Sequence, residues 1–148
     1  MLCWHCASLS AGLQLTMSSE GDRHEAYQDQ GGVWTIGYGH TGPDVHAGLV
    51  WTEAQAQAAL TQDKASARAA IREYLKVSLT QNEFDALEDF DFNVGEGNFA
   101  GSALLKLLNA GNFAGAAKQL EQWDHVKGQV VLGLLNRRLA EEALFDKA

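Results

Sequence analysis

Two carboxylic acids and a threonine stand close together near the N-terminus, in the stretch EGDRHEAYQDQGGVWTIGYGHT of residues 20–41. Glu20, Asp29 and Thr35 could together cleave the acetal bond between two sugars. That reaction needs a protonated acid beside the leaving oxygen, and a nucleophile or an activated water on the opposite face of the ring. A partly desolvated site would keep Glu20 protonated, whereas a turn open to water would leave Asp29 ionised. The Thr35 hydroxyl could hold a water against Asp29.

The acid is expected at the end of a helix. Ser8 or Ser10 can cap a helix that runs through about Met17, so Glu20 would emerge at its C-terminal end. Spacing alone leaves a plainer interpretation open, because Glu, Asp and Thr also serve widely as caps, turn residues and solvated strand positions.

The other two groups are expected on a β-hairpin. Residues 26–28 and 33–39 flank a turn-forming DQGG sequence, and the second arm is rich in β-branched and aromatic residues. Thr35, Gly37 and Gly39 would share one face of this hairpin. The two glycines would then leave room for a sugar ring beside the polar groups.

The rest of the chain is predicted to be helical. Thr52 with Gln55, and Thr80 with Glu83, resemble capping boxes that open two helices. The predicted helices cover about 53–75, 81–94, 103–110, 113–122 and 133–145, with GEGN ending the second, Gly111 at a helix end and Asn112 as an N-cap.

The predicted organisation is a single domain over residues 1–148. A small lobe with the hairpin covers about 10–60, a linking helix about 53–75, and a helical lobe about 76–146. A groove between two lobes is a natural place for a ligand.

Composition excludes several classes of partner. The net charge of −8 and the pI of about 5.0 disfavour nucleic acid. No segment reaches the roughly 18 apolar residues that span a bilayer. His5, His24, His46 and His125 show no metal-ligand spacing, and no cofactor is indicated. Cys3 and Cys6 form a lone C-x-x-C without a second ligand pair, and are expected to be incidental.

The motif E20-G-x-R-x-x-A-Y-x-D29-x-x-G-V-x-T35-I-G-Y-G-H-T resembles the signature of the phage endolysin lysozymes, the bacteriophage muramidases of glycoside hydrolase family 24. The similarity continues in FNVGEGNFAGSALLKLLNAG and GLLNRRLAEEALF, so it covers residues from about 10 to 146. The resemblance implies an α+β, lysozyme-like fold and cleavage of the β-1,4 bond between N-acetylmuramic acid and N-acetylglucosamine in peptidoglycan. It makes Glu20 the general acid, Asp29 the residue that positions or activates water, and Thr35 its helper.

The resemblance also suggests contacts to the sugar from Phe92, Asn93 with the nearby Gly95, Ser102 and Arg137, and it implies that one late arginine approaches the catalytic acid. Alternatives remain open for three of these residues: core packing for Phe92, an N-cap for Ser102, and an i to i+4 pair with Glu141 for Arg137, with a similar pair between Arg138 and Glu142. His40 resembles a family histidine with a structural role.

Asp91 departs from the pattern, because the family has a small uncharged residue there. A buried, unpaired carboxylate is costly, so Asp91 should either reach solvent in the groove or find a partner.

Two rival functions are a lytic transglycosylase, which needs one acid, and an inactive lysozyme-like domain that only binds cell wall. Asp29 and Thr35 argue against the transglycosylase, and the presence of Glu20, Asp29 and Thr35 together argues against the inactive domain. The implied partner is the peptidoglycan glycan strand. The protein is expected to act as a monomer without a cofactor, to bind no nucleic acid and not to insert stably into a membrane. The implied location is the host cytoplasm, from which the protein reaches the wall through a separate pore.

Overall fold

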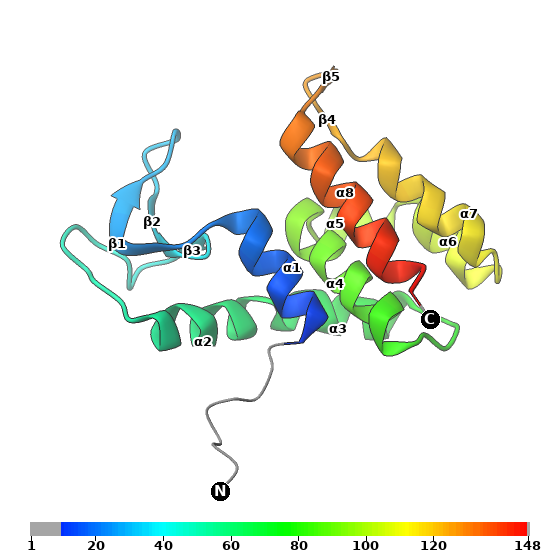
Figure 1. The fold of residues 1–148 in the computed structure, drawn as a ribbon, viewed down its shortest axis with the longest axis horizontal. Helices are drawn as coiled ribbons and strands as arrows, with labels where there is room; N and C mark the ends of the chain where they lie inside the picture. The colour runs from blue at the N-terminus through cyan, green and yellow to red at the C-terminus, as the bar shows by residue number, and fades with distance from the viewer. Residues whose placement is uncertain (1–9, 148) are drawn as a thin grey trace, which may run out of the picture.

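The structure, a computed structural model, describes residues 10–147. A small antiparallel sheet lies at one end of the molecule with α2 beneath it, and α4 to α8 form a helical lobe at the other end, with α1 between them (Figure 1). The elements in chain order are α1 (Ala11–Glu20), β1 (Arg23–Gln28), β2 (Trp34–Gly37), β3 (His40–Thr41), α2 (Glu53–Asp63), α3 (Ala65–Tyr74), α4 (Gln81–Val94), α5 (Glu96–Ala100), α6 (Ala103–Asn109), α7 (Phe113–Gln119), the 3-10 turn η1 (Leu120–Gln122), β4 (His125–Val126), β5 (Gln129–Val130) and α8 (Leu132–Phe145).

The first sheet has the order β1-β2-β3, with β2 in the centre. Tyr27 lies opposite Thr35, and Thr35 lies opposite Thr41 on the third strand. The backbone N–H of Trp51 donates to the carbonyl of His24 at 2.8 Å, so the segment that leads into α2 is attached to β1. The hairpin predicted from the DQGG turn is present, and the third strand is an addition.

The helical lobe packs around α4, which contacts α1, α3, α5 and α8. Every residue of α4 from position 85 to 91 is buried, so this helix is enclosed on all sides. A helix enclosed on all sides is expected to carry an apolar surface all round, and α4 instead buries several acids, which must then find partners. The main core consists of Ile71, Ala86, Leu87, Phe90, Phe99, Leu104, Leu105, Leu108, Ala116, Ala117, Leu120 and Phe145.

A second apolar cluster joins the two lobes. Tyr38, Ala56 and Leu60 form its buried part, and Met17 of α1 and Phe92 of α4 pack against it. The sequence pattern predicted this first helix as part of the small lobe, but α1 packs against α4 and α8. Glu20 therefore extends from the helical lobe toward the sheet.

The capping boxes at Thr52 and Thr80 are both formed, and Asn112 caps α7. The long helix predicted over 53–75 is divided at Lys64, whose ψ of −7° departs from the helical value. The buried amino group of Lys64 donates to Glu88 Oε1 at 2.8 Å and to the Thr16 hydroxyl at 2.9 Å. These contacts attach the junction between α2 and α3 to the helical lobe.

Besides β3, one helix and one hairpin were not predicted. The GEGN sequence ends α4 as predicted, but the helix α5 begins directly after Gly95. The hairpin of β4 and β5 turns through Lys127 and Gly128, whose φ angles are 52° and 78°. Positive φ at both turn residues is typical of a two-residue type I′ hairpin, and a Lys-Gly pair is a weaker signal for it than Asn-Gly.

Cys3 and Cys6 lie outside the described residues, so the expectation about them stays a prediction.

Within residues 10–147 none of the helices combines the length and the apolar character that a membrane crossing requires.

Candidate active site

Glu20 is the last residue of α1, and its side chain is 23% exposed. Its Oε1 accepts a hydrogen bond from Arg137 Nη1 of α8 at 2.7 Å. Gly21 caps the helix with a φ of 71°, which lets the chain turn at once into β1. The acid is thus fixed at a junction between helix and sheet, as the helix pattern predicted.

Arg137 is held by a buried carboxylate. Its Nε and Nη2 donate to the two oxygens of Asp89 at 2.9 and 2.8 Å, in the bidentate geometry that suits a guanidinium. Asp89 is fully buried and also accepts from the Thr16 hydroxyl at 2.7 Å. Burial alone would raise the pKa of Asp89, but the hydrogen bonds from Arg137 outweigh it and the pKa lies below its usual range.

The second oxygen of Glu20 faces the backbone of Gly39. A Cβ atom added to Gly39 would lie 3.3 Å from Glu20 Oε2, and Gly39 has a φ of 83° that other residues rarely adopt. Gly39 therefore allows the Glu20 carboxylate to lie close to the backbone, and the expected room for a sugar ring stays a prediction. Gly37 lies elsewhere, because its added Cβ would meet the Trp51 ring at 3.2 Å and Ala56 at 3.3 Å.

Asp29 follows β1 directly and is exposed in the turn. Its Oδ1 accepts from the backbone N–H groups of Gly31 at 2.8 Å and Val33 at 2.9 Å. These bonds fix the carboxylate in one orientation. Among the described residues no hydrogen bond uses Oδ2, which leaves this oxygen to a ligand or to water.

Thr35 lies in the central strand and is 5% exposed. Its hydroxyl donates to the Val33 carbonyl at 3.0 Å. Because its single hydrogen is used there, the hydroxyl can only accept from a water molecule. Its role as a helper to Asp29 stays a prediction.

The suggested sugar contacts occupy different environments. Phe92 is half-buried in the cluster that joins the lobes, and it also lines a hollow of about 310 Å³ with Asp63, Ser66 and Glu96. Ser102 is 3% exposed and caps α6 by accepting from Leu105, while it donates to the Phe99 carbonyl at 2.7 Å. The capping alternative therefore describes Ser102.

Asn93 contacts the second late arginine. Its Oδ1 accepts from Arg138 Nη2 at 2.8 Å, and the same nitrogen donates to Glu141 Oε1 at 2.8 Å. The predicted pair of Arg138 with Glu142 is wrong, because Glu142 pairs with Lys118 of α7 at 2.9 Å.

His40 has the structural surroundings that the resemblance implied. Its Nδ1 lies 2.7 Å from Asp63 of α2, and its Nε2 lies 3.1 Å from Asp44. Burial would lower the pKa of His40, but the hydrogen bonds with these carboxylates outweigh it and raise the pKa. The ring ties β3 to the end of α2.

Asp91 fits neither alternative from the sequence. It is 2% exposed, and its Oδ2 is buried without a hydrogen-bond partner beside the 310 Å³ hollow. Burial, and then the charge of Glu96, raise the pKa of Asp91 to about 6. The carboxyl group is therefore most easily accommodated in its neutral form.

Asp91→Asn is expected to stabilise the protein at pH 7.5 and to change little at pH 4. A carboxyl whose folded pKa exceeds its unfolded value disfavours folding as the pH rises above the unfolded value, so the penalty is small at pH 4 and complete above about pH 6. The expected gain at pH 7.5 is about 1 to 2 kcal/mol, measured by urea unfolding at both pH values. An equal effect at the two pH values would contradict this assignment.

Asp89 was not identified from the sequence. Its position between Leu87 and Phe90, both core residues, was an available signal, because an acid among core positions needs a buried partner. The identity of that partner depends on how α4 packs against α8, which no local pattern specifies.

A helical lobe, a small sheet and an acid at the C-terminal end of α1 together form the arrangement of a lysozyme-like protein. The sequence profile described as phage lysozyme matches residues 17–141. An endolysin of Acyrthosiphon pisum secondary endosymbiont phage 1 is 43% identical over 141 residues, which are 93% of this chain and 96% of that protein. An endolysin of Bacillus phage PZA is 44% identical over 92% of this chain, which spans 54% of its length.

Solved structures agree with this relationship. The muramidase domain of SpmX from Asticaccaulis excentricus has a TM-score of 0.88 and 37% identity, covering 95% of this chain and 97% of that one. An endolysin from Escherichia coli O157:H7 phage FAHEc1 has a TM-score of 0.86 and 38% identity, covering 95% and 94%. The chain belongs to the phage lysozyme family. It is a glycoside hydrolase of the muramidase type, and the predicted α+β, lysozyme-like fold is confirmed.

Proposed function

We propose that the protein hydrolyses the β-1,4 bond between N-acetylmuramic acid and N-acetylglucosamine in peptidoglycan, with Glu20 as general acid and Asp29 as the base that activates water. The observation that carries this proposal is that the two oxygens of Glu20 have different neighbours. Oε1 accepts from the guanidinium of Arg137, and Oε2 lies against the backbone of Gly39. The proton to be donated would therefore reside on Oε2, the oxygen that Arg137 leaves free.

In the proposed step, the proton on Glu20 Oε2 moves to the glycosidic oxygen as the bond from that oxygen to the anomeric carbon breaks. A water molecule attacks the anomeric carbon from the opposite face and loses a proton to Asp29 Oδ2. Thr35 would orient this water by accepting one of its hydrogens. This arrangement inverts the anomeric configuration, and it requires about 6.5 to 9.5 Å between the two carboxyl groups.

Arg137 acts in this account as a positioning residue. It orients Glu20 through Nη1, and its own position is fixed by Asp89. Phe92 and Asn93 remain the proposed sugar contacts on the helical lobe. We leave Ser102 out of this set, because its hydroxyl already donates to Phe99 and accepts from Leu105.

Asp29→Asn is expected to lower the rate of sugar-end release from purified peptidoglycan by about 10² to 10⁴-fold. The amide oxygen can still accept from Gly31 and Val33, so the turn should keep its conformation. The amide nitrogen cannot accept a proton from water. Asp146→Asn, an exposed aspartate in the C-terminal segment, is the matched control. Equal rates for the two variants would remove Asp29 from the mechanism.

We propose that a monomer is made in the host cytoplasm and reaches the wall after a separate pore forms. Fractionation of producing cells before and after membrane permeabilisation would test this location.

A further inference from the structure

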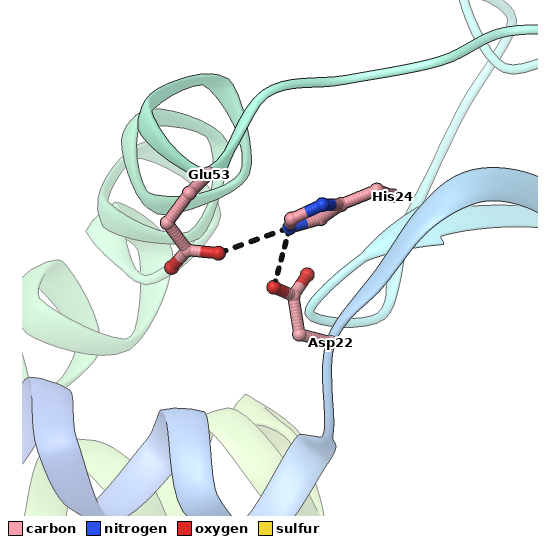
Figure 2. A group of neighbouring side chains, drawn as sticks. All are labelled: Asp22, His24 and Glu53. Atoms are coloured by element: carbon pink, nitrogen blue, oxygen red, sulfur yellow. Dashed lines mark hydrogen bonds and ion pairs between the residues drawn. The ribbon is translucent and has the colours of Figure 1, made fainter.

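Three potential metal ligands converge at the base of the small lobe, apart from the groups used in the proposed mechanism (Figure 2). Asp22 lies between α1 and β1, His24 lies in β1, and Glu53 is the first residue of α2. His24 Nε2 lies 2.6 Å from Asp22 Oδ2 and 3.0 Å from Glu53 Oε2. One donor atom from each residue lies within 4.8 Å of the others.

We propose that Asp22, His24 and Glu53 form a Zn²⁺ site that joins the start of β1 to the start of α2. One imidazole nitrogen and two carboxylate oxygens, with water in the fourth position, are a donor set that zinc accepts. Zinc bonds of about 2.0 to 2.2 Å in a tetrahedral arrangement separate the donors by about 3.4 Å. Each carboxylate oxygen needs to move less than 1 Å away from His24 Nε2 to reach that spacing, and all three side chains are solvent-accessible.

The charges of the cluster favour a dication. Two carboxylates face the same ring nitrogen, and that nitrogen carries at most one hydrogen, so it cannot donate fully to both. A metal ion at this point would contact both carboxylates and the nitrogen at once. The imidazole favours zinc over Mg²⁺ or Ca²⁺, because those hard cations take oxygen ligands.

Surrounding hydrogen bonds already orient one ligand. Glu53 Oε1 accepts from the Tyr38 hydroxyl at 2.6 Å and from Gln57 Nε2 at 2.8 Å, which leaves Oε2 directed at His24. The capping box of Thr52 and Gln55 fixes the backbone of Glu53 at the start of α2. Such outer contacts fix the orientation of a metal-binding carboxylate before the ion arrives.

The proposal is tested with Zn²⁺ alone, added to the metal-free full-length chain. Cys3, His5 and Cys6 are also zinc-binding residue types, so every measurement uses a background with Cys3→Ser, His5→Gln and Cys6→Ser. Calorimetry is expected to show one Zn²⁺ per chain, and saturation is expected to raise Tm by about 5 °C or more. The same concentrations of Mg²⁺ are expected to give neither effect.

Asp22→Asn and His24→Gln are each expected to weaken zinc affinity about tenfold or more. His46→Gln is the matched control, because His46 is an exposed loop histidine whose Nδ1 contacts the Ala47 carbonyl, outside the cluster. Circular dichroism checks that each variant is folded. If His24→Gln does not fold, the zinc affinity of Asp22→Asn tests the site. Unchanged affinity in the folded variants, or no saturable binding in the parent, would overturn the site. Neither readout depends on cell-wall cleavage.

Discussion

Glu20→Gln is expected to abolish clearing of outer-membrane-permeabilised bacteria, with a loss of about 10² to 10⁴-fold or more in rate. Glutamine keeps an oxygen that can accept from Arg137, so the contact at 2.7 Å has a replacement. It carries no acidic proton at the position of Oε2, next to Gly39. The leaving sugar would then depart as an unprotonated alkoxide, which is the step that the acid avoids.

The matched control for this experiment is Glu73→Gln, which makes the same chemical change at an exposed position of α3. Tm and circular dichroism are measured for both variants, so that a loss of activity is separated from a loss of fold. Clearing by Glu20→Gln at the rate of Glu73→Gln would show that another group supplies the proton.

Asp89→Asn is expected to destabilise the protein by about 3 kcal/mol at pH 7 and to lower Tm by about 6 to 12 °C. The substitution removes the charge that faces two nitrogens of Arg137, whose side chain is only 6% exposed. Breaking a buried pair on one side leaves the other charge without full compensation. Glu20 at 2.7 Å and Glu141 at 3.9 Å remain near Arg137, but neither replaces the bidentate contact of Asp89.

The cost of Asp89→Asn should depend on pH with a defined sign. The pKa of Asp89 is below its usual range in the folded state, so its contribution is complete above the unfolded value of about 3.9 and is lost as the pH falls through the folded pKa. Urea unfolding is expected to show a difference from the parent that is constant from pH 5 to 7 and shrinks in stronger acid. A variant as stable as Asp146→Asn at pH 7 would contradict the role given to Asp89.

Local patterns predicted the parts of the fold that depend on neighbours in sequence. The caps at Thr52 and Thr80 and the hairpin around DQGG were predicted because each requires only a few consecutive residues. The break at Lys64 was missed, since it accompanies contacts to Thr16 and Glu88, which are far away in sequence.

The residues of the candidate site also include some that the local sequence indicated and others that it did not. Glu20, Asp29 and Thr35 fall within one short motif, so residue types and resemblance pointed to them together. The contact between Arg137 and Glu20 followed only from the resemblance. Asp89 was missed, because its role is defined by packing between α4 and α8.

Arg138 shows the limit of helix spacing as an argument. An i to i+4 pair with Glu142 was plausible on an isolated helix, but α7 brings Lys118 to Glu142 and α4 brings Asn93 to Arg138. Arg138 instead pairs with Glu141, three residues further along α8, so contacts with other helices determined which carboxylate it pairs with.

The most direct test of the account is the mass of the fragments that the protein releases from purified peptidoglycan. Hydrolysis through a proton donor and an activated water adds one water to each cleaved bond, so the fragments should end in reducing N-acetylmuramic acid. In ¹⁸O-labelled water the label should appear at that end. Fragments ending in 1,6-anhydro-N-acetylmuramic acid, without the added water, would show that no water is activated and would contradict the mechanism.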